Sequence, residues 1–240
     1  MSRWFVAAVL ACTVAACGGG NGPTGPTSNP RLSRTKMMAF GDSLTSGEVT
    51  APVSRVPGSI TALIVVPTAS YPTNLQAQLQ SSYPAQTSAI TVTNQGRSGE
   101  TVFDGVIRFE QVFDESRPEV VLIQEGVNGI SSFGAAASTA LIRAMVQRAQ
   151  NGQARVFVGS MVPTIAGRQR SQDANALVAY NSALQAMAVQ EGVVYVDLYN
   201  GMLPQVTTWI GIDGLHPNEA GYRRMAELFA EAIRANLEVR

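Results

Sequence analysis

Two short polar motifs near opposite ends of the sequence contain residues that together could perform nucleophilic catalysis. One is Gly-Asp-Ser-Leu at 41–44, and the other is Asp-Gly-Leu-His at 213–216, which holds the only histidine of the chain. A serine hydroxyl is a weak nucleophile at neutral pH and needs an adjacent base, so His216 is the candidate base for Ser43. Asp213 stands three positions before His216, and its carboxylate can orient the imidazole and stabilise the imidazolium.

Attack of a serine on a carbonyl carbon also requires hydrogen-bond donors for the oxyanion that develops. Two further polar segments could supply them, Asn-Gln-Gly at 94–96 and Gly-Val-Asn at 126–128. The candidate donors are the backbone N–H groups of Ser43 and Gly96 and the side-chain amide of Asn128. These residue types predict an acyl-transfer site.

The elements that must position these residues alternate between strands and helices. Continuous apolar runs such as 120–123 are typical of strands in a parallel sheet that is buried on both faces. Five strands are expected, followed in turn by helical segments, and this order indicates an α/β fold with right-handed crossovers. The expected strands are 37–40, 89–93, 120–123, 156–158 and 193–196. The expected helices are 71–83, 101–115, 135–150, 174–191 and a last one that follows Asn218 and runs to about 237, with Pro217 near its first turn. The polar motifs follow four of these strands, and ligands bind at that edge of such sheets.

Composition excludes several other functions. The net charge is zero and charged residues make up 14% of the chain, so no basic surface for nucleic acid is expected. The two cysteines, Cys12 and Cys17, both lie within the first 17 residues. A cysteine nucleophile, a zinc cluster and a disulfide are therefore excluded from the domain that follows.

The first residues have the layout of a targeting segment. An apolar stretch of signal-peptide length ends at 17 in Val-Ala-Ala-Cys, which resembles a bacterial lipobox with Cys17 as the lipidated residue. An ordinary secretory peptide is the alternative. We expect a signal peptide at 1–17, a flexible Gly-Pro-Thr-rich tether at 18–36 and a hydrolase domain at 37–240. The protein is accordingly expected in the cell envelope, anchored to a membrane by lipid, or secreted.

The stretch from Val49 to Ser70 contains an apolar run at 60–66. An extra edge strand or hairpin that covers the core is the first interpretation. The second is an apolar wall over the substrate pocket, with Leu63, Ile64 and Val65 as candidate substrate-binding residues. The second interpretation favours substrates with acyl chains.

Taken together, the four motifs resemble those of the SGNH, or GDSL, hydrolase family, in the order of that family and over about 180 residues. The resemblance implies a three-layer, flavodoxin-like fold with a parallel sheet of strand order 2-1-3-4-5. It also implies hydrolysis of carboxylic esters or thioesters without a metal or other cofactor. The resemblance implies the roles given above: Ser43 as nucleophile, His216 as base, Asp213 as the residue that orients His216, and Ser43, Gly96 and Asn128 as oxyanion donors. One departure is Gly129, where the third motif of the family usually has aspartate.

Several functions remain open at this point. An esterase or lipase that acts on a small ester or a lipid competes with a carbohydrate O-acetyl esterase. A catalytically silent lipoprotein that binds lipid or glycan is the alternative from another class. A carboxylate pair of the kind found in glycosidases would need residues such as Glu100, Asp104, Asp114 or Glu125, which we expect on solvated helix faces and loops.

Overall fold

The structure, a computed structural model, describes residue 1, residues 29–52 and residues 61–240. The unit from Pro30 to Val239 is built around a five-stranded parallel sheet of order β5-β2-β6-β7-β8. Its strands are β2 (Lys36–Gly41), β5 (Thr91–Gly96), β6 (Val120–Gln124), β7 (Arg155–Gly159) and β8 (Val194–Val196). The α/β fold and the strand order 2-1-3-4-5 are therefore confirmed.

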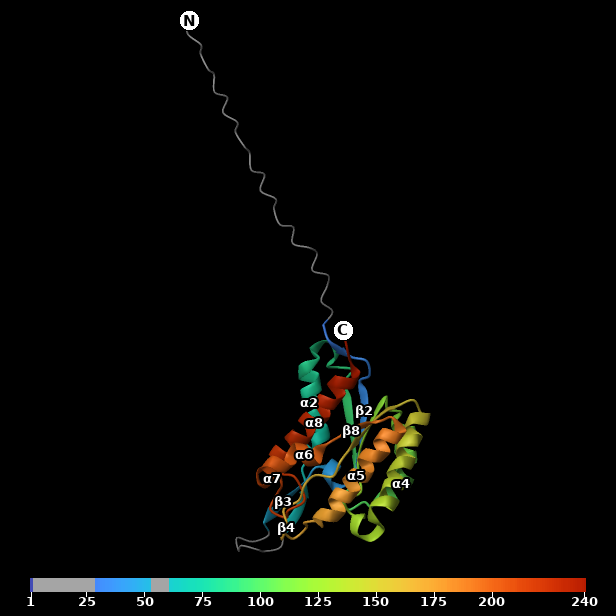
Figure 1. The fold of residues 1–240 in the computed structure, drawn as a ribbon, viewed down its shortest axis with the longest axis vertical. Helices are drawn as coiled ribbons and strands as arrows, with labels where there is room; N and C mark the ends of the chain where they lie inside the picture. Colours follow the sequence, from blue (N-terminus) through green and yellow to red (C-terminus); the bar gives the residue numbers. More distant parts are fainter. Residues whose placement is uncertain (2–28, 53–60) are drawn as a thin grey trace. The chain divides into compact units, whose positions relative to one another are not determined.

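Helices cover both faces of the sheet (Figure 1). On one face α2 (Tyr71–Ser82) packs against α8 (Glu219–Leu237), and on the other α4 (Ile130–Asn151) packs against α3 (Val102–Ser116) and α5 (Ala174–Glu191). The short helices are α1 (Ser43–Ser46), α6 (Leu198–Met202) and α7 (Val206–Trp209), with 3₁₀ turns η1 (Pro84–Gln86) and η2 (Leu203–Gln205). This arrangement forms the three predicted layers.

The two apolar runs at the centre of the sheet form its buried core. Residues 37–40 of β2 and 120–123 of β6 are at most 1% exposed. Local signals set the ends of the surrounding helices. Asn218 caps α8 by accepting a hydrogen bond from the Gly221 N–H, and Gly192 ends α5 with a φ of 65°.

The predicted tether is too long at its C-terminal end. Arg31–Leu32 (β1) pairs antiparallel with Glu238–Val239 (β9), and Ser33 Oγ donates to the carbonyl of Leu237 at 3.0 Å. The compact unit therefore begins at Pro30 instead of residue 37. Residues 2–28, including Cys12 and Cys17, lie outside the described residues.

The stretch after the first motif forms an antiparallel hairpin, as the first interpretation predicted. Its strands are β3 (Glu48–Pro52) and β4 (Thr61–Val65), and residues 53–60 between them lie outside the described residues. Leu63, Ile64 and Val65 are 36%, 48% and 47% exposed. The expectation that this apolar run covers the core is therefore wrong.

Several element boundaries also differ from the predictions. The second strand was expected at 89–93, but β5 continues to Gly96. Helix α4 begins at Ile130, before the expected residue 135, and bends at Gly134, whose φ is 73°. The last helix agrees with its prediction, because α8 begins directly after Asn218 and Pro217 lies near its first turn, where it forms a β-bridge with Ile210.

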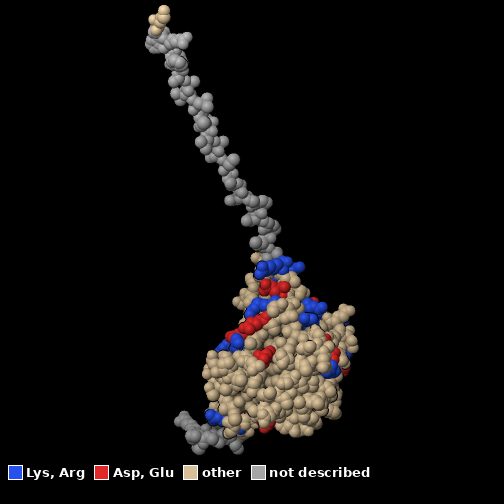
Figure 2. All heavy atoms as spheres, in the orientation of Figure 1, with Lys and Arg blue, Asp and Glu red and all other residues tan. Residues whose placement is uncertain are grey.

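The surface agrees with the low content of charged residues. On the face shown in Figure 2, lysine, arginine, aspartate and glutamate gather mainly in the upper part of the domain, and most of the rest of this face is uncharged. Within the described ranges, no helix has both the length and the apolar character needed to cross a membrane.

Candidate active site

Ser43 lies where the chain leaves β2 and turns into α1. The turn is tight at Gly41, where a Cβ atom would lie only 1.9 Å from the carbonyl oxygen of Gln124, so only glycine fits. Asp42 then caps α1 through a hydrogen bond from the Leu44 N–H to Oδ1 at 3.0 Å. Gly47 ends the helix with a φ of 93°. Ser43 is thereby held at the carboxyl edge of the sheet.

The structure brings Ser43, His216 and Asp213 together. His216 Nε2 lies 2.9 Å from Ser43 Oγ, and His216 Nδ1 lies 2.6 Å from Asp213 Oδ2. All three residues are at most 3% exposed. This is the geometry of a nucleophile, a base and a group that orients the base.

The carboxylate of Asp213 is stabilised in its ionised form. Burial by itself would raise the pKa of Asp213, but the hydrogen bonds from His216 and from the Leu215 N–H lower it below its ordinary value. Asp213 Oδ1 accepts the backbone N–H groups of Leu215 and His216, both at 3.1 Å. One oxygen therefore fixes the loop and the other fixes the imidazole.

The loop that carries Asp213 and His216 is braced from two sides. The N–H of Gly211 donates to the carbonyl of His216 at 2.7 Å, which closes the loop on itself. The N–H of Arg170 donates to the carbonyl of Asp213 at 2.9 Å. The segment around residue 170 thus helps to place the two catalytic candidates.

Gly96 does not reach the site predicted for it. As the last residue of β5 it pairs with Gly41, and its N–H donates to Asn94 Oδ1 at 2.9 Å. A Cβ at Gly96 would lie 2.1 Å from the backbone nitrogen of Ser46, so this residue packs behind α1. The prediction of Gly96 as an oxyanion donor is not supported, because its hydrogen is already donated.

Gly99 is the glycine that lines the cleft beside Ser43 and His216. Its φ is 75°, and no heavy atom lies within 4 Å of the place where its Cβ would be. The sequence contained the signal in the second glycine of Gly-Arg-Ser-Gly at 96–99. The predicted strand ended at residue 93, three residues before the end of β5, and the glycine expected to follow it was therefore Gly96 instead of Gly99.

Asn128 also lines the cleft. Its Nδ2 donates to the carbonyl of Glu100 at 2.8 Å. Because an amide group carries two N–H bonds, this contact fixes the side chain and leaves the second hydrogen for another acceptor. Gly129 follows as the capping residue of α4 and offers no side-chain hydrogen bond there.

The cleft next to Ser43 and His216 has a volume of about 340 Å³. Of the three predicted substrate-binding residues, Leu63 lines it, whereas Ile64 and Val65 do not. Most of the remaining wall is polar and includes side chains that the sequence did not single out. These are Glu48, Gln169, Arg170, Ser171 and Gln172.

Two of the cleft side chains are charged. Glu48 Oε2 lies 3.5 Å from His216 Nε2, and its side chain is 9% exposed. Arg170 Nη1 lies 3.9 Å from Asp213 Oδ2 and donates to Thr61 Oγ1 at 2.7 Å, which links the hairpin to the loop that carries Asp213.

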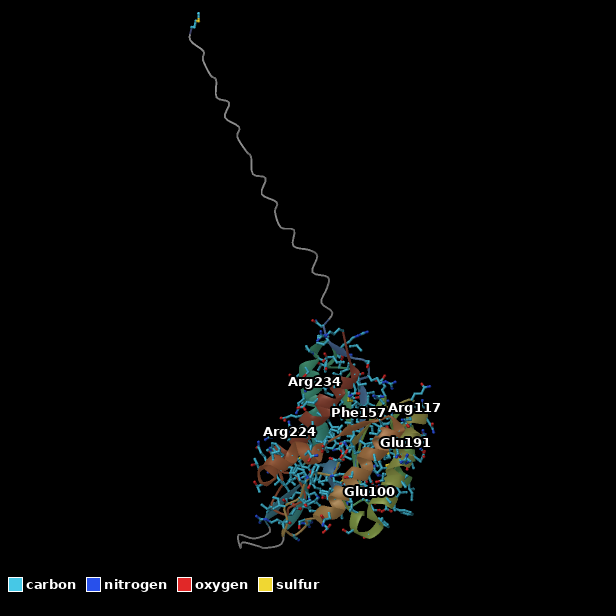
Figure 3. The ribbon with its side chains drawn as sticks, viewed as in Figure 1. Glu100, Arg117, Phe157, Glu191, Arg224 and Arg234 are labelled. Carbon is cyan, nitrogen blue, oxygen red and sulfur yellow. The ribbon has the colours of Figure 1, made fainter. Side chains whose placement is uncertain are left out.

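Two further carboxylates, Glu100 and Glu125, are buried, contrary to the expectation that they are solvated. Glu100 is 4% exposed and forms an ion pair with Arg108, and Glu125 is 1% exposed. Figure 3 labels Glu100 toward the lower end of the domain, the end at which Figure 1 shows β3 and β4. Asp104 and Asp114 are exposed, as expected.

Burial shifts the pKa of two carboxyl groups in this region, those of Asp42 and Glu125. It raises the pKa of Asp42 to about 6, although the N–H groups of Leu44, Gly126 and Val127 act in the opposite direction. It also raises the pKa of Glu125 well above its ordinary value, and the charges of Asp42 and Glu100 add to this. Neither carboxyl oxygen of Glu125 has a hydrogen-bond partner among the described residues.

The fold and the site define a class. A three-layer α/β domain with serine, histidine and aspartate in hydrogen-bond contact at the carboxyl edge of its sheet is a serine hydrolase. Within the described residues, no three histidine, cysteine, aspartate or glutamate side chains gather into a group that could hold a metal ion.

The family follows from comparison with known proteins. The chain belongs to the GDSL-like lipase/acylhydrolase family, whose model matches residues 39–224. It is 25% identical over 146 residues to an arylesterase from Vibrio mimicus, a match that covers 60% of this chain and 70% of the arylesterase. The protein is accordingly a serine ester hydrolase of the GDSL type.

Solved structures share the fold. A lipase/acylhydrolase from Enterococcus faecalis superimposes with a TM-score of 0.66 at 20% identity, covering 85% of this chain and 97% of that one. A catalytic mutant of an acetylxylan esterase from Geobacillus stearothermophilus gives a TM-score of 0.65 at 19% identity, with 85% and 95% covered.

Proposed function

We propose that Ser43, His216 and Asp213 form the catalytic triad of a carboxylic ester hydrolase that works through an acyl-serine intermediate. The observation that carries the proposal is the pair of contacts on His216, 2.9 Å to Ser43 Oγ and 2.6 Å to Asp213 Oδ2. The first contact lets His216 accept the serine proton. The second keeps the ring in the tautomer that leaves Nε2 available.

The reaction proceeds in two halves, acylation of Ser43 and deacylation by water. Ser43 Oγ attacks the ester carbonyl while His216 Nε2 takes its proton, and collapse of the tetrahedral intermediate expels the alcohol, which receives that proton. Water then attacks the acyl-serine while His216 Nε2 takes its proton, and collapse of the second tetrahedral intermediate returns that proton to Ser43 Oγ and releases the carboxylic acid. No cofactor takes part in either half.

The oxyanion is proposed to be held by the backbone N–H groups of Ser43 and Gly99 and by the amide of Asn128. All three residues line the same cleft as His216. Gly99 replaces Gly96 in this role, because the N–H of Gly96 is donated to Asn94. Donors fixed before the reaction stabilise the charge without reorganisation.

The test is direct labelling of the serine. A fluorophosphonate probe should label the parent protein and leave Ser43→Ala unlabelled, because the probe reacts only with an activated hydroxyl. Ser182→Ala, an exposed serine on α5, is the matched control and should be labelled like the parent. A folded parent protein that resists the probe would favour a catalytically silent binding protein.

For the substrate, we propose an ester with a short acyl group, and a carbohydrate O-acetyl ester is the second candidate. The polar wall formed by Gln169, Ser171 and Gln172 favours hydroxyl-rich alcohols, and Leu63 provides limited apolar surface for an acyl chain. Nitrophenyl esters from acetate to octanoate, assayed beside acetylated xylan, separate the candidates. A rate that increases steadily with chain length would favour a lipid ester.

We further propose that the protein resides in the cell envelope, attached through a lipid on Cys17. The support is the apolar segment and the Val-Ala-Ala-Cys ending at 14–17. Cys17→Ser should then release the protein from membranes without affecting hydrolysis. If fractionation finds the parent protein wholly soluble, ordinary secretion is the better explanation.

A further inference from the structure

We propose that Glu48 is a specificity-determining residue that makes the cleft reject negatively charged esters. The proposal rests on the proposed triad, because it concerns substrates that reach Ser43. It predicts that uncharged and cationic esters are accepted and that esters with a carboxylate near the scissile bond are hydrolysed poorly.

The backbone holds Glu48 in place beside the reacting atoms. It is the first residue of β3 and follows Gly47 directly, where the chain turns out of α1. Its carbonyl accepts a hydrogen bond from Tyr222 Oη at 2.6 Å. Its carboxylate lies 3.5 Å from His216 Nε2, the same nitrogen that contacts Ser43 Oγ.

The charge balance of the cleft leaves Glu48 uncompensated among the described residues. The positive charge of Arg170 faces Asp213 at 3.9 Å, so these two charges largely cancel. His216 must be neutral to accept the serine proton. The remaining charge on the described wall is the carboxylate of Glu48, which is too buried to be screened well by water or salt.

This charge is close enough to act on a substrate. At an effective dielectric constant of about 20, two like charges ~8 Å apart repel strongly enough to lower kcat/KM on the order of 10- to 100-fold. The same carboxylate stabilises the imidazolium that forms during acylation, which gives a reason for its presence beside the base.

The test uses two acetate esters that differ in a single charge, 3-acetoxybenzoate and its neutral methyl ester, with release of the phenol as the readout. The parent should prefer the neutral ester on the order of 10- to 100-fold, and Glu48→Gln should reduce this preference at least tenfold. Glu219→Gln removes an equal charge from an exposed position on α8 and should keep the parental preference. An unchanged preference in Glu48→Gln would overturn the proposal.

A measurement on the parent protein alone covers the case in which Glu48→Gln does not fold. The cationic ester 3-acetoxy-N,N,N-trimethylanilinium should be hydrolysed at least as efficiently as the neutral ester, and the anionic ester least. Equal kcat/KM for the anionic and the cationic ester would show that the cleft does not discriminate between substrates by charge. Failure of the parent to hydrolyse any of the three would instead count against the proposed function.

Discussion

His216 Nε2 lies 2.9 Å from Ser43 Oγ, although 173 residues separate them in the chain. The strand β2 delivers Ser43 to the carboxyl edge of the sheet, and the loop before α8 delivers His216 to the same place. Asp213 Oδ1 accepts the N–H groups that fold this loop, and Asp213 Oδ2 contacts the imidazole, so chemistry and local folding depend on the same carboxylate.

Loss of the base should be as damaging as loss of the nucleophile. His216→Ala and Ser43→Ala should each lower kcat by roughly 10⁶-fold, and the double variant should be little worse, because the two residues act as a unit. Steady-state kinetics with nitrophenyl acetate measures this. Additive losses in the double variant would argue against direct proton transfer between them.

Asp213→Asn should cause a smaller loss of kcat than Ser43→Ala, since the serine and the imidazole remain. The substitution should also change the pH dependence of stability. Because the pKa of Asp213 is lowered in the folded state, its ionised form stabilises the fold above its unfolded pKa of 3.8, and this contribution is lost as the pH falls. The difference in Tm between parent and variant should be largest near neutral pH and shrink under acidic conditions.

The oxyanion donors can be tested one at a time. Asn128→Ala should lower kcat on the order of 10²- to 10³-fold with little change in KM. Gly99→Ala should also lower kcat, because a side chain at a φ of 75° displaces the N–H. Gly192→Ala carries similar strain at a φ of 65° outside the cleft, and it should reduce Tm without reducing kcat. Equal kinetic losses at Gly99 and Gly192 would contradict the assignment.

Neighbouring residues of β4 should differ in their effect on acyl-chain preference. Leu63→Ser should reduce kcat/KM for hexanoate esters roughly 4- to 15-fold, because each methylene removed from apolar contact costs about 0.8 kcal/mol. Acetate esters should be nearly unaffected. Ile64→Ser is the control, since Ile64 is exposed and does not line the cleft. The same loss of kcat/KM in both variants would mean that the substitutions disturb the hairpin in general and that Leu63 has no specific contact with the acyl chain.

Glu125→Gln should stabilise the protein increasingly as the pH rises. The folded-state pKa of Glu125 is raised, so its contribution to stability is full below its unfolded value of 4.5 and is lost as the pH rises toward the folded-state value. The gain in Tm should therefore grow as the pH rises above 4.5. Glu119→Gln should show the opposite sign, because the Lys36 and Thr35 N–H groups lower the pKa of Glu119.

The sequence by itself determined the fold class and the three central residues of the site. The apolar runs 37–40 and 120–123 have the length and composition of inner strands, and the structure buries both. His216 was found because it is the only histidine of the chain, and Ser43 because it directly follows the first predicted strand within Gly-Asp-Ser-Leu. A local sequence pattern is sufficient to predict a site residue where the required chemistry and the direction of the strands leave one candidate.

Tertiary structure decided the rest, because it depends on contacts between distant residues. Whether Gly96 or Gly99 lines the cleft depends on where the pairing of β5 with β2 ends, and three residues of strand length change the answer. The pairing of β1 with β9 joins opposite ends of the chain, so no local pattern marks it. The burial of Glu48 and Glu125 has the same origin. A carboxylate that is solvated in the unfolded chain becomes desolvated only when separate elements close around it.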